Sequence, residues 1–113
     1  MPAHQPSPQH IGSQLAKYRK ARNLTQEEVA VRLEIGAEAI SRMERGQVEL
    51  TVSKLLQLAD IFECSADELL LAISTRPQDQ WQLIAARLKD LSADDRQFAL
   101  ESLERLTAHL AMK

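Results

Sequence analysis

The chain has 113 residues, of which 44% are hydrophobic and 27% are charged, a balance typical of one globular domain with an extension. It lacks both the roughly 18 uninterrupted apolar residues of a membrane span and the charged and apolar regions of a secretory signal, so we expect a cytoplasmic protein without a membrane partner. The net charge of −2 disfavours nucleic acid, but residues 1–54 carry eight Lys or Arg against six Asp or Glu, whereas residues 55–113 carry six against ten.

Residues 1–10 are rich in proline and glutamine and have no apolar periodicity, which predicts a disordered tail. His4 and His10 have no Cys or carboxylate nearby that would complete a metal site. The single Cys64 lies in an apolar run and is predicted to be a small buried side chain rather than half of a disulfide. We therefore expect neither a bound metal nor another cofactor.

The first predicted helix spans residues 11–22, because Ile11, Leu15 and Tyr18 recur four and three positions apart. It carries the densest positive cluster of the chain: Lys17, Arg19, Lys20 and Arg22. For such a cluster, the alternatives are a solvated helix face and a contact with nucleic acid.

Thr25 opens the central stretch of the chain, which ends at Gly46. The Thr25 hydroxyl can cap a helix start while Glu28, three residues later, reaches back to the backbone amide of Thr25. Leu24 and Val29 flank this capping box as a hydrophobic staple. A helix is therefore predicted to begin directly after Thr25.

Two short helices with a tight turn between them are predicted in this stretch. Helical spacing relates Val29, Ala30 and Leu33 in the first helix and Ile40, Met43 and Glu44 in the second. Residues 34–36 interrupt the period, and Gly46 is suited to close the second helix. Helices of about eight residues are unstable alone, because isolated helices below roughly 12–15 residues are marginal, so the pair must belong to a larger helical core. DNA-binding proteins use such a pair to place the second helix in the major groove.

A fourth helix is predicted after Thr51, which is suited to cap it. The amino end of this helix would offer free backbone amides to a phosphate, with the help of Thr51, Ser53 and Lys54. The predicted apolar stripe comprises Val52, Leu55, Leu56, Ala59 and Phe62.

A short fifth helix is predicted after Ser65, which can form a second capping box with Glu68. Leu69 and Leu70 would anchor this helix. Residues 11–74 thus contain five helices, enough for one compact bundle. Residues 74–77 then break the pattern and end in a proline suited to the first turn of a new helix.

Two further amphipathic helices are predicted in residues 77–113. The first carries Trp81, Ile84, Ala85, Leu88 and Leu91, and the second, which Ser92 can cap, carries Ala99, Leu103, Leu106 and Leu110. Their short junction predicts a bent pair or an antiparallel hairpin. Because these helices follow a complete bundle, their apolar faces predict homodimerisation. The expected dimer interface comprises Trp81, Ile84, Leu88, Leu103, Leu106 and Leu110, with ordinary intrachain packing as the alternative for the tryptophan.

The runs LTQEEVAVRL, AISRMERG and LLQLADIFECSADELL resemble the phage-repressor-like (Xre/Cro) helix-turn-helix family over about residues 11–73. Members of that family fold as five-helix bundles and bind operator DNA, usually as dimers, to regulate transcription. The resemblance therefore implies an all-α fold: a five-helix repressor-like DNA-binding bundle in residues 11–74, followed by two C-terminal helices for dimerisation.

The resemblance also implies roles for individual residues. The recognition-helix positions that face bases are Ala37, Glu38, Ser41 and Arg42. Gln26 and Arg45 match phosphate-contact positions, and Arg19 and Glu44 match a structural ion pair. When charge and helix position are considered too, the expected phosphate contacts are Gln26, Arg45, Thr51, Ser53, Lys54 and Lys17.

Three positions depart from the family pattern. Glu34 replaces the usual turn glycine, and a non-glycine residue in a left-handed conformation costs about 1–2 kcal/mol. Glu49 and Leu50 replace a basic residue and a proline before the fourth helix, and Glu49 would face the DNA backbone unfavourably. The fold is expected to tolerate these changes.

The function expected from these features is sequence-specific transcriptional regulation. A homodimeric repressor would bind a near-palindromic double-stranded operator in the nucleoid of a bacterium or its phage. The alternative is a protein-interaction module, such as an antitoxin or an adaptor, that binds a protein partner and has weak or no DNA binding. An enzyme is not expected, because the histidines are scattered, the cysteine has no evident base, and no glycine-rich phosphate loop is present.

Overall fold

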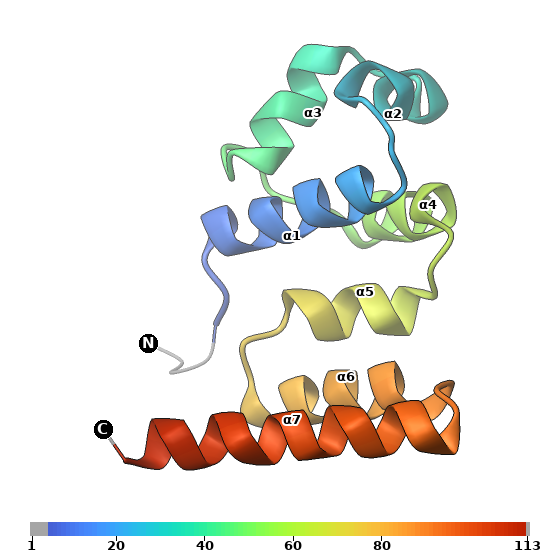
Figure 1. Cartoon of the computed structure of the whole chain (residues 1–113). Helices are drawn as coiled ribbons and strands as arrows, with labels where there is room; N and C mark the ends of the chain where they lie inside the picture. Colours follow the sequence, from blue (N-terminus) through green and yellow to red (C-terminus); the bar gives the residue numbers. More distant parts are fainter. Residues whose placement is uncertain (1–4, 113) are drawn as a thin grey trace.

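The computed structural model describes residues 5–112, which form seven α-helices and no strand (Figure 1). The helices are α1 Pro8–Ala21, α2 Gln26–Leu33, α3 Ala37–Glu44, α4 Val52–Phe62, α5 Ala66–Ile73, α6 Pro77–Lys89 and α7 Ala93–Ala111. The first five pack into a bundle, α6 packs on α5, and α7 contacts α6. The predicted all-α class, with five helices followed by two, is confirmed.

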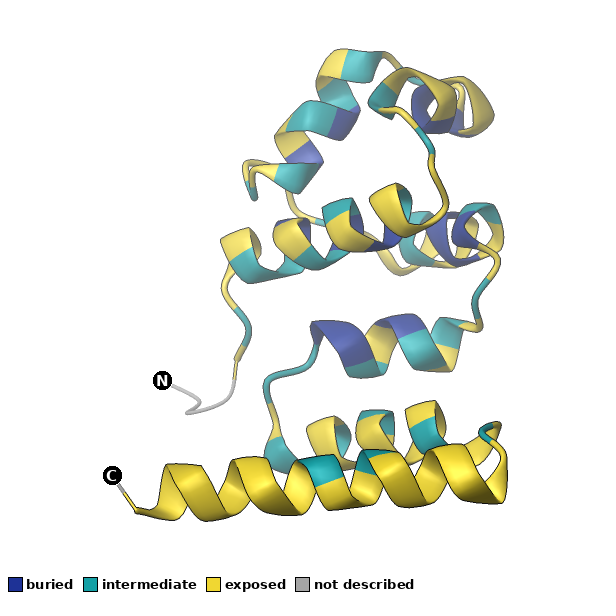
Figure 2. Cartoon of the chain, in the orientation of Figure 1, coloured by how far each residue is buried: buried dark blue, intermediate teal, exposed yellow. Residues whose placement is uncertain are grey.

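The buried hydrophobic core lies entirely within α1–α5 (Figure 2). Its members are Leu15, Tyr18, Val29, Ala30, Leu33, Ile40, Met43, Leu58, Ala59, Phe62, Leu69, Ala72 and Ile73. Neither α6 nor α7 contains a buried residue, so these two helices are attached to the core and are not part of it. The half-buried Cys64 packs against the core, and its burial, followed by the nearby Glu68 carboxylate, raises the pKa of its thiol.

The first helix begins at Pro8, three residues before the predicted start. The Ser7 hydroxyl accepts a hydrogen bond from the His10 amide at 3.0 Å, and proline suits the first helical turn because the amide it lacks would have no partner there. The prediction of a disordered tail over residues 1–10 is therefore wrong for residues 8–10. Residues 1–4 lie outside the described part of the chain.

The predicted signals of the central helix pair are confirmed. Thr25 and Glu28 form the reciprocal capping box, and the backbone amide of Thr25 lowers the pKa of the Glu28 carboxyl. Glu34 caps α2 in the left-handed region with φ of 58°. Gly46, with φ of 74°, follows α3 and lies so close to Pro8 that a Cβ atom there would meet its backbone at 2.6 Å.

The core-facing side of α4 differs from the predicted stripe. Val52 and Leu56 are 73% and 50% exposed, while Leu58 is buried. The buried and half-buried residues at 55, 58, 59 and 62 follow the i, i+3, i+4, i+7 pattern of one helix face. In α5, likewise, Leu69 is buried but Leu70 is 53% exposed. Both helices carry consecutive apolar residues, so their sequences are compatible with more than one inward face.

The second predicted capping box forms only in part. The Ser65 hydroxyl accepts from the Glu68 amide, but the Glu68 carboxylate accepts from Tyr18 and Arg87. The Ser92 hydroxyl caps α7 as predicted, and α7 runs back across α6 in Figure 1. None of the described helices is long and apolar enough to cross a membrane.

Candidate nucleic-acid interface

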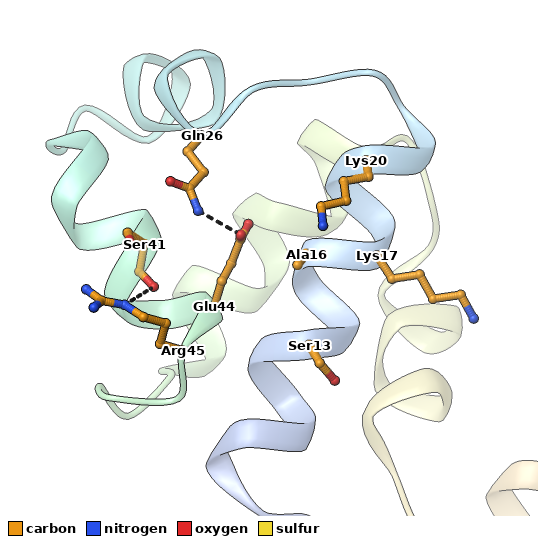
Figure 3. A pocket seen from close by; sticks show the side chains of 8 residues that line it. All are labelled: Ser13, Ala16, Lys17, Lys20, Gln26, Ser41, Glu44 and Arg45. Carbon is orange, nitrogen blue, oxygen red and sulfur yellow. Dashed lines mark hydrogen bonds between the residues drawn. The ribbon is translucent and has the colours of Figure 1, made fainter.

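A groove between α1 and α3, closed at one end by the start of α2, gathers three of the six predicted phosphate-contact residues (Figure 3). It is lined by Ser13, Ala16, Lys17, Lys20, Gln26, Ser41, Glu44 and Arg45. None of the ion pairs described in residues 5–112 involves Lys17, Lys20 or Arg45. The groove therefore offers three unpaired cations to an anionic ligand.

The floor of the groove is an ion pair between α1 and α3. Arg19 donates through Nε to Oε2 of Glu44 at 2.7 Å and through Nη2 to Oε1 at 3.1 Å. Its Nη1 donates to the Leu24 carbonyl at 2.8 Å. The two side chains are only 12% and 10% exposed and satisfy each other, so this pair connects α1 to α3 and leaves no free charge for a ligand.

Gln26 lies where α2 begins, beside the same ion pair. Its Nε2 donates to Oε1 of Glu44 at 2.9 Å, which leaves the second proton of the amide group free. As the first residue of α2, Gln26 also has a backbone amide without an intrahelical acceptor. Both donors can bind a phosphate at the helix amino terminus, where the helix dipole favours negative charge.

The exposed residues of α3 are Glu38 and Arg42, one helical turn apart. Ser41 is half-buried at the edge of the groove, and its carbonyl accepts from Nε of Arg45 at 3.3 Å. Ala37 is half-buried against the core, so part of its methyl group is already in contact with protein. Of the four predicted base-contact residues, Glu38 and Arg42 extend furthest into solvent.

The amino terminus of α4 forms a separate polar edge outside the groove. The Thr51 hydroxyl accepts from the Lys54 amide at 3.1 Å and keeps its own proton to donate. Thr51 and Ser53 are exposed and Lys54 is half-buried. The structure thus brings together Lys17, Gln26, Ser41 and Arg45, and it leaves Thr51, Ser53 and Lys54 at a second location.

Three groove residues were not among the predicted contacts: Ser13, Ala16 and Lys20. With Lys17 they occupy the i, i+3, i+4, i+7 positions of one α1 face, a signal present in the sequence. In Figure 3 the Lys20 side chain extends toward Glu44, whereas Lys17 extends away from it. Arg22 of the same positive cluster pairs instead with Glu63, the residue that caps the carboxyl end of α4.

The residues of the predicted dimer interface lie on α6 and α7. Trp81, Ile84, Leu103, Leu106 and Leu110 are exposed, and Leu88 is half-buried. Trp81 is 67% exposed, so it is not anchored in the core of its own chain. Phe98, Leu100 and Met112, which are not among the predicted residues, are exposed on or beside α7 as well.

Comparisons with known proteins find the same fold around α2 and α3. Residues 15–69 match the family model HTH_3, described as helix-turn-helix. Among solved structures, the chain is similar to the clp gene regulator ClgR from C. glutamicum, with 21% identity and a TM-score of 0.56 over 61% of this chain and 91% of that one. It is also similar to NHTF, a hypothetical transcription factor from Neisseria, with 24% identity and a TM-score of 0.53 over 74% of this chain and 95% of that one.

A third similar structure is an HTH_3 family transcriptional regulator from Vibrio cholerae, with 25% identity and a TM-score of 0.50 over 56% of this chain and 35% of that one. No curated protein sequence matches the chain significantly. The family match covers α2 and α3 together with the parts of the bundle that hold them. It is through residues 15–69 that the chain resembles the helix-turn-helix family HTH_3.

Proposed function

We propose that the protein is a homodimeric repressor that binds a near-palindromic operator. The HTH_3 match and the regulators among the similar structures support a DNA-binding transcriptional regulator. The observation that carries the proposal is the position of α3, whose exposed residues lie beside the unpaired cations of the α1–α3 groove. An α-helix fits the major groove, and the neighbouring cations would then lie against the phosphates.

Base recognition in this proposal rests on α3. Arg42 can donate two hydrogen bonds to O6 and N7 of guanine, a contact worth about 1–3 kcal/mol of discrimination. Ser41 can donate or accept, and Glu38 can accept from the amino group of cytosine. Ala37 can contribute a methyl contact with thymine through the part of its side chain that remains exposed.

Phosphate binding rests on two places. The first is the groove, with Lys17, Gln26 and Arg45, to which the structure adds Lys20. The second is the amino terminus of α4, with Thr51, Ser53 and Lys54. If the four cations of each subunit all neutralise phosphates, log K would fall with log salt at a slope of about −7 for the dimer.

Dimerisation is assigned to α6 and α7. Exposed apolar patches of this kind are uncommon in monomeric proteins and mark interaction sites. A second copy with the same surface is the simplest complement, because a two-fold interface is complementary to itself. Two recognition helices held in this way would reach half-sites about 34 Å apart, one turn of DNA.

The test is selection of bound fragments from the source genome at low salt, followed by a salt titration on the best fragment. Enrichment of a short inverted repeat, with affinity that falls steeply as salt rises, is the expected result. The proposal fails if no sequence is enriched and the remaining binding disappears at about physiological salt.

A protein-interaction module is the second candidate. Glu38 on α3 and Glu49 before α4 are exposed acidic groups beside the proposed DNA surface, and the apolar residues of α6 and α7 would suit a different protein as well. Under this candidate the purified chain sediments as a stoichiometric complex with one protein partner, and the genomic selection enriches nothing. An enriched inverted repeat bound by the isolated chain would exclude it as the sole function.

A further inference from the structure

A triangle of side chains joins α6 to two helices of the bundle. Arg87 on α6 donates through Nη1 to Oε2 of Glu68 on α5 and through Nη2 to the hydroxyl of Tyr18 on α1, both at 2.9 Å. Tyr18 donates its own proton to Oε2 of Glu68, also at 2.9 Å. The guanidinium carbon lies 6.0 Å from the centre of the Tyr18 ring. Each member of the Tyr18–Glu68–Arg87 triangle is therefore held by both others.

This triangle is the main polar attachment of the two C-terminal helices. Within residues 5–112, every described side-chain hydrogen bond from α6 or α7 to α1–α5 comes from Arg87. The apolar attachment is small, because α6 and α7 have no buried residue and Leu83 is only half-buried against the core. The orientation of α6 thus depends on Leu83, on the linker after α5 and on Arg87.

The linker fixes only the near end of α6. The Ser74 hydroxyl donates to Asp79 at 2.7 Å and accepts from the Arg76 amide at 3.1 Å, and Pro77 begins the helix. Arg87 lies ten residues further along, about 15 Å from Pro77 at the helical rise of 1.5 Å per residue. Without a contact there, a rotation of about 10° at the linker would move the far end of α6 by roughly 3 Å.

We propose that Arg87 is a positioning residue that fixes the orientation of α6 and α7 on the bundle, and thereby sets the half-site spacing that the dimer accepts. The proposal rests on the dimeric DNA-binding function proposed above. One base pair changes the separation of two half-sites by about 3.4 Å and their relative rotation by about 34°. Discrimination between neighbouring spacings therefore requires each bundle to be held rigidly on the dimerising helices.

The exposure of the triangle favours a role in orientation over a role in folding. The Arg87 side chain is 52% exposed and that of Glu68 30% exposed, and ion pairs in such positions add little to stability. The Tyr18 ring also packs beside Phe62, with ring centres 6.2 Å apart, a contact in which Arg87 takes no part. Variants at position 87 are therefore expected to remain folded.

The test compares the full-length chain with Arg87→Ala and with Lys89→Ala, a matched control that removes an exposed cation two residues away on α6. Affinity is measured for operators whose half-site separation is changed by one or two base pairs in either direction. We expect the wild-type chain and Lys89→Ala to prefer one spacing by tenfold or more, and Arg87→Ala to retain a preference below about threefold. Sedimentation should show the same dimer association for all three proteins.

Tyr18→Phe provides a second variant, since it removes one corner of the triangle and keeps the ring. Hydrogen exchange provides a readout without DNA: amides of α6 should exchange faster in Arg87→Ala and Tyr18→Phe than in Lys89→Ala. An unchanged spacing preference or unchanged exchange in Arg87→Ala would overturn the positioning role. If the wild-type chain is a monomer, or binds no paired half-sites at any spacing, the dimeric function itself fails, and the spacing role fails with it.

Discussion

Glu44 illustrates how the contacts of one residue change the meaning of its charge. It is an acidic side chain at the end of the proposed recognition helix, where a free carboxylate would repel phosphates. Its two oxygens instead accept from Arg19, whose guanidinium neutralises the charge, and from the neutral amide of Gln26. These contacts connect α3 to α1 and α2. The same contacts leave Lys17, Lys20 and Arg45 as the free charges of the groove.

Removing one partner of this ion pair should destabilise the fold. Glu44→Ala leaves the nearly buried Arg19 without a counter-charge, so the free energy of unfolding should fall by about 3 kcal/mol. Urea unfolding measures this free energy. The control is Glu38→Ala, which changes an exposed residue of the same helix and should alter the free energy of unfolding by less than about 0.5 kcal/mol. Equal losses in the two variants would show that the pair is not structural.

If α3 contacts the bases, substitutions in it should change which operator sequences the protein prefers. Arg42→Ala should reduce discrimination at one operator position by about 1–3 kcal/mol, because it removes the bidentate contact with guanine. Arg45→Ala should weaken binding to all sequences by a similar factor, since a phosphate contact carries no sequence information. Selection from a random library measures both preference profiles. An unchanged profile for Arg42→Ala would refute the assignment of α3.

At the scale of elements, the close packing of α1 and α3 depends on Gly12. A Cβ atom at this position would lie 2.4 Å from the carbonyl oxygen of Glu44, so only a residue without a side chain allows the two helices to approach this closely. The contact lies near the Arg19–Glu44 pair, and the two features together set the width of the groove.

Gly12→Ala should therefore destabilise the bundle although alanine is the better helix former. The clash is with backbone, which cannot move aside as a flexible side chain can, and a loss of about 1–3 kcal/mol is expected. Thermal unfolding measures the loss, and Ser13→Ala, at the next and exposed position, serves as the control. A stability of Gly12→Ala at or above wild type would mean that α1 and α3 are further apart than described.

The turn between α2 and α3 stores strain at Glu34. Its φ of 58° is in the left-handed region, which costs a residue with a Cβ atom about 1–2 kcal/mol. Glu34→Gly should stabilise the protein by roughly 0.5–1 kcal/mol, because relief of this strain exceeds the added entropy of the unfolded chain. Glu34→Ala keeps the Cβ atom and is the matched control. The prediction fails if the glycine variant is no more stable than the alanine variant.

At the scale of the whole molecule, burial is distributed unevenly. The core occupies α1–α5, whereas no residue of α6 or α7 is buried and most of their large apolar side chains are exposed (Figure 2). A surface that single chains leave uncovered can be buried by association, and this is the basis of the proposed dimer.

A charge placed in that surface should separate the two copies. Leu106→Glu should convert the dimer to monomers and lower the affinity for a paired operator by 100-fold or more, because the second half-site then no longer binds within the same complex. Sedimentation and operator titration measure the two effects. Ala108→Glu adds the same charge about 200° around α7 and should retain the dimer. If Leu106→Glu still forms dimers, the dimer interface does not include this part of α7.

Most of the helix starts and turns could be predicted from local sequence signals. Caps and turns act over three or four residues, so the capping box at Thr25, the break at residues 34–36, Gly46 and the cap at Ser92 could be recognised without knowledge of the fold. The start of α1 differs from the prediction, because the prolines of residues 1–10 favour disorder whereas Pro8 follows the capping Ser7 and begins the helix.

The contacts between helices, in contrast, could not be predicted from the sequence. Leu58 rather than Leu56 enters the core, Glu68 turns from its own helix start to Tyr18 and Arg87, and Gly12 meets a carbonyl from α3. The partners lie far apart in the chain: Glu68 is 19 residues from Arg87 and 50 residues from Tyr18. No local pattern in the sequence carries information about such pairs. The physical reason is that helix signals depend on near neighbours, whereas burial and side-chain pairing depend on how whole helices pack.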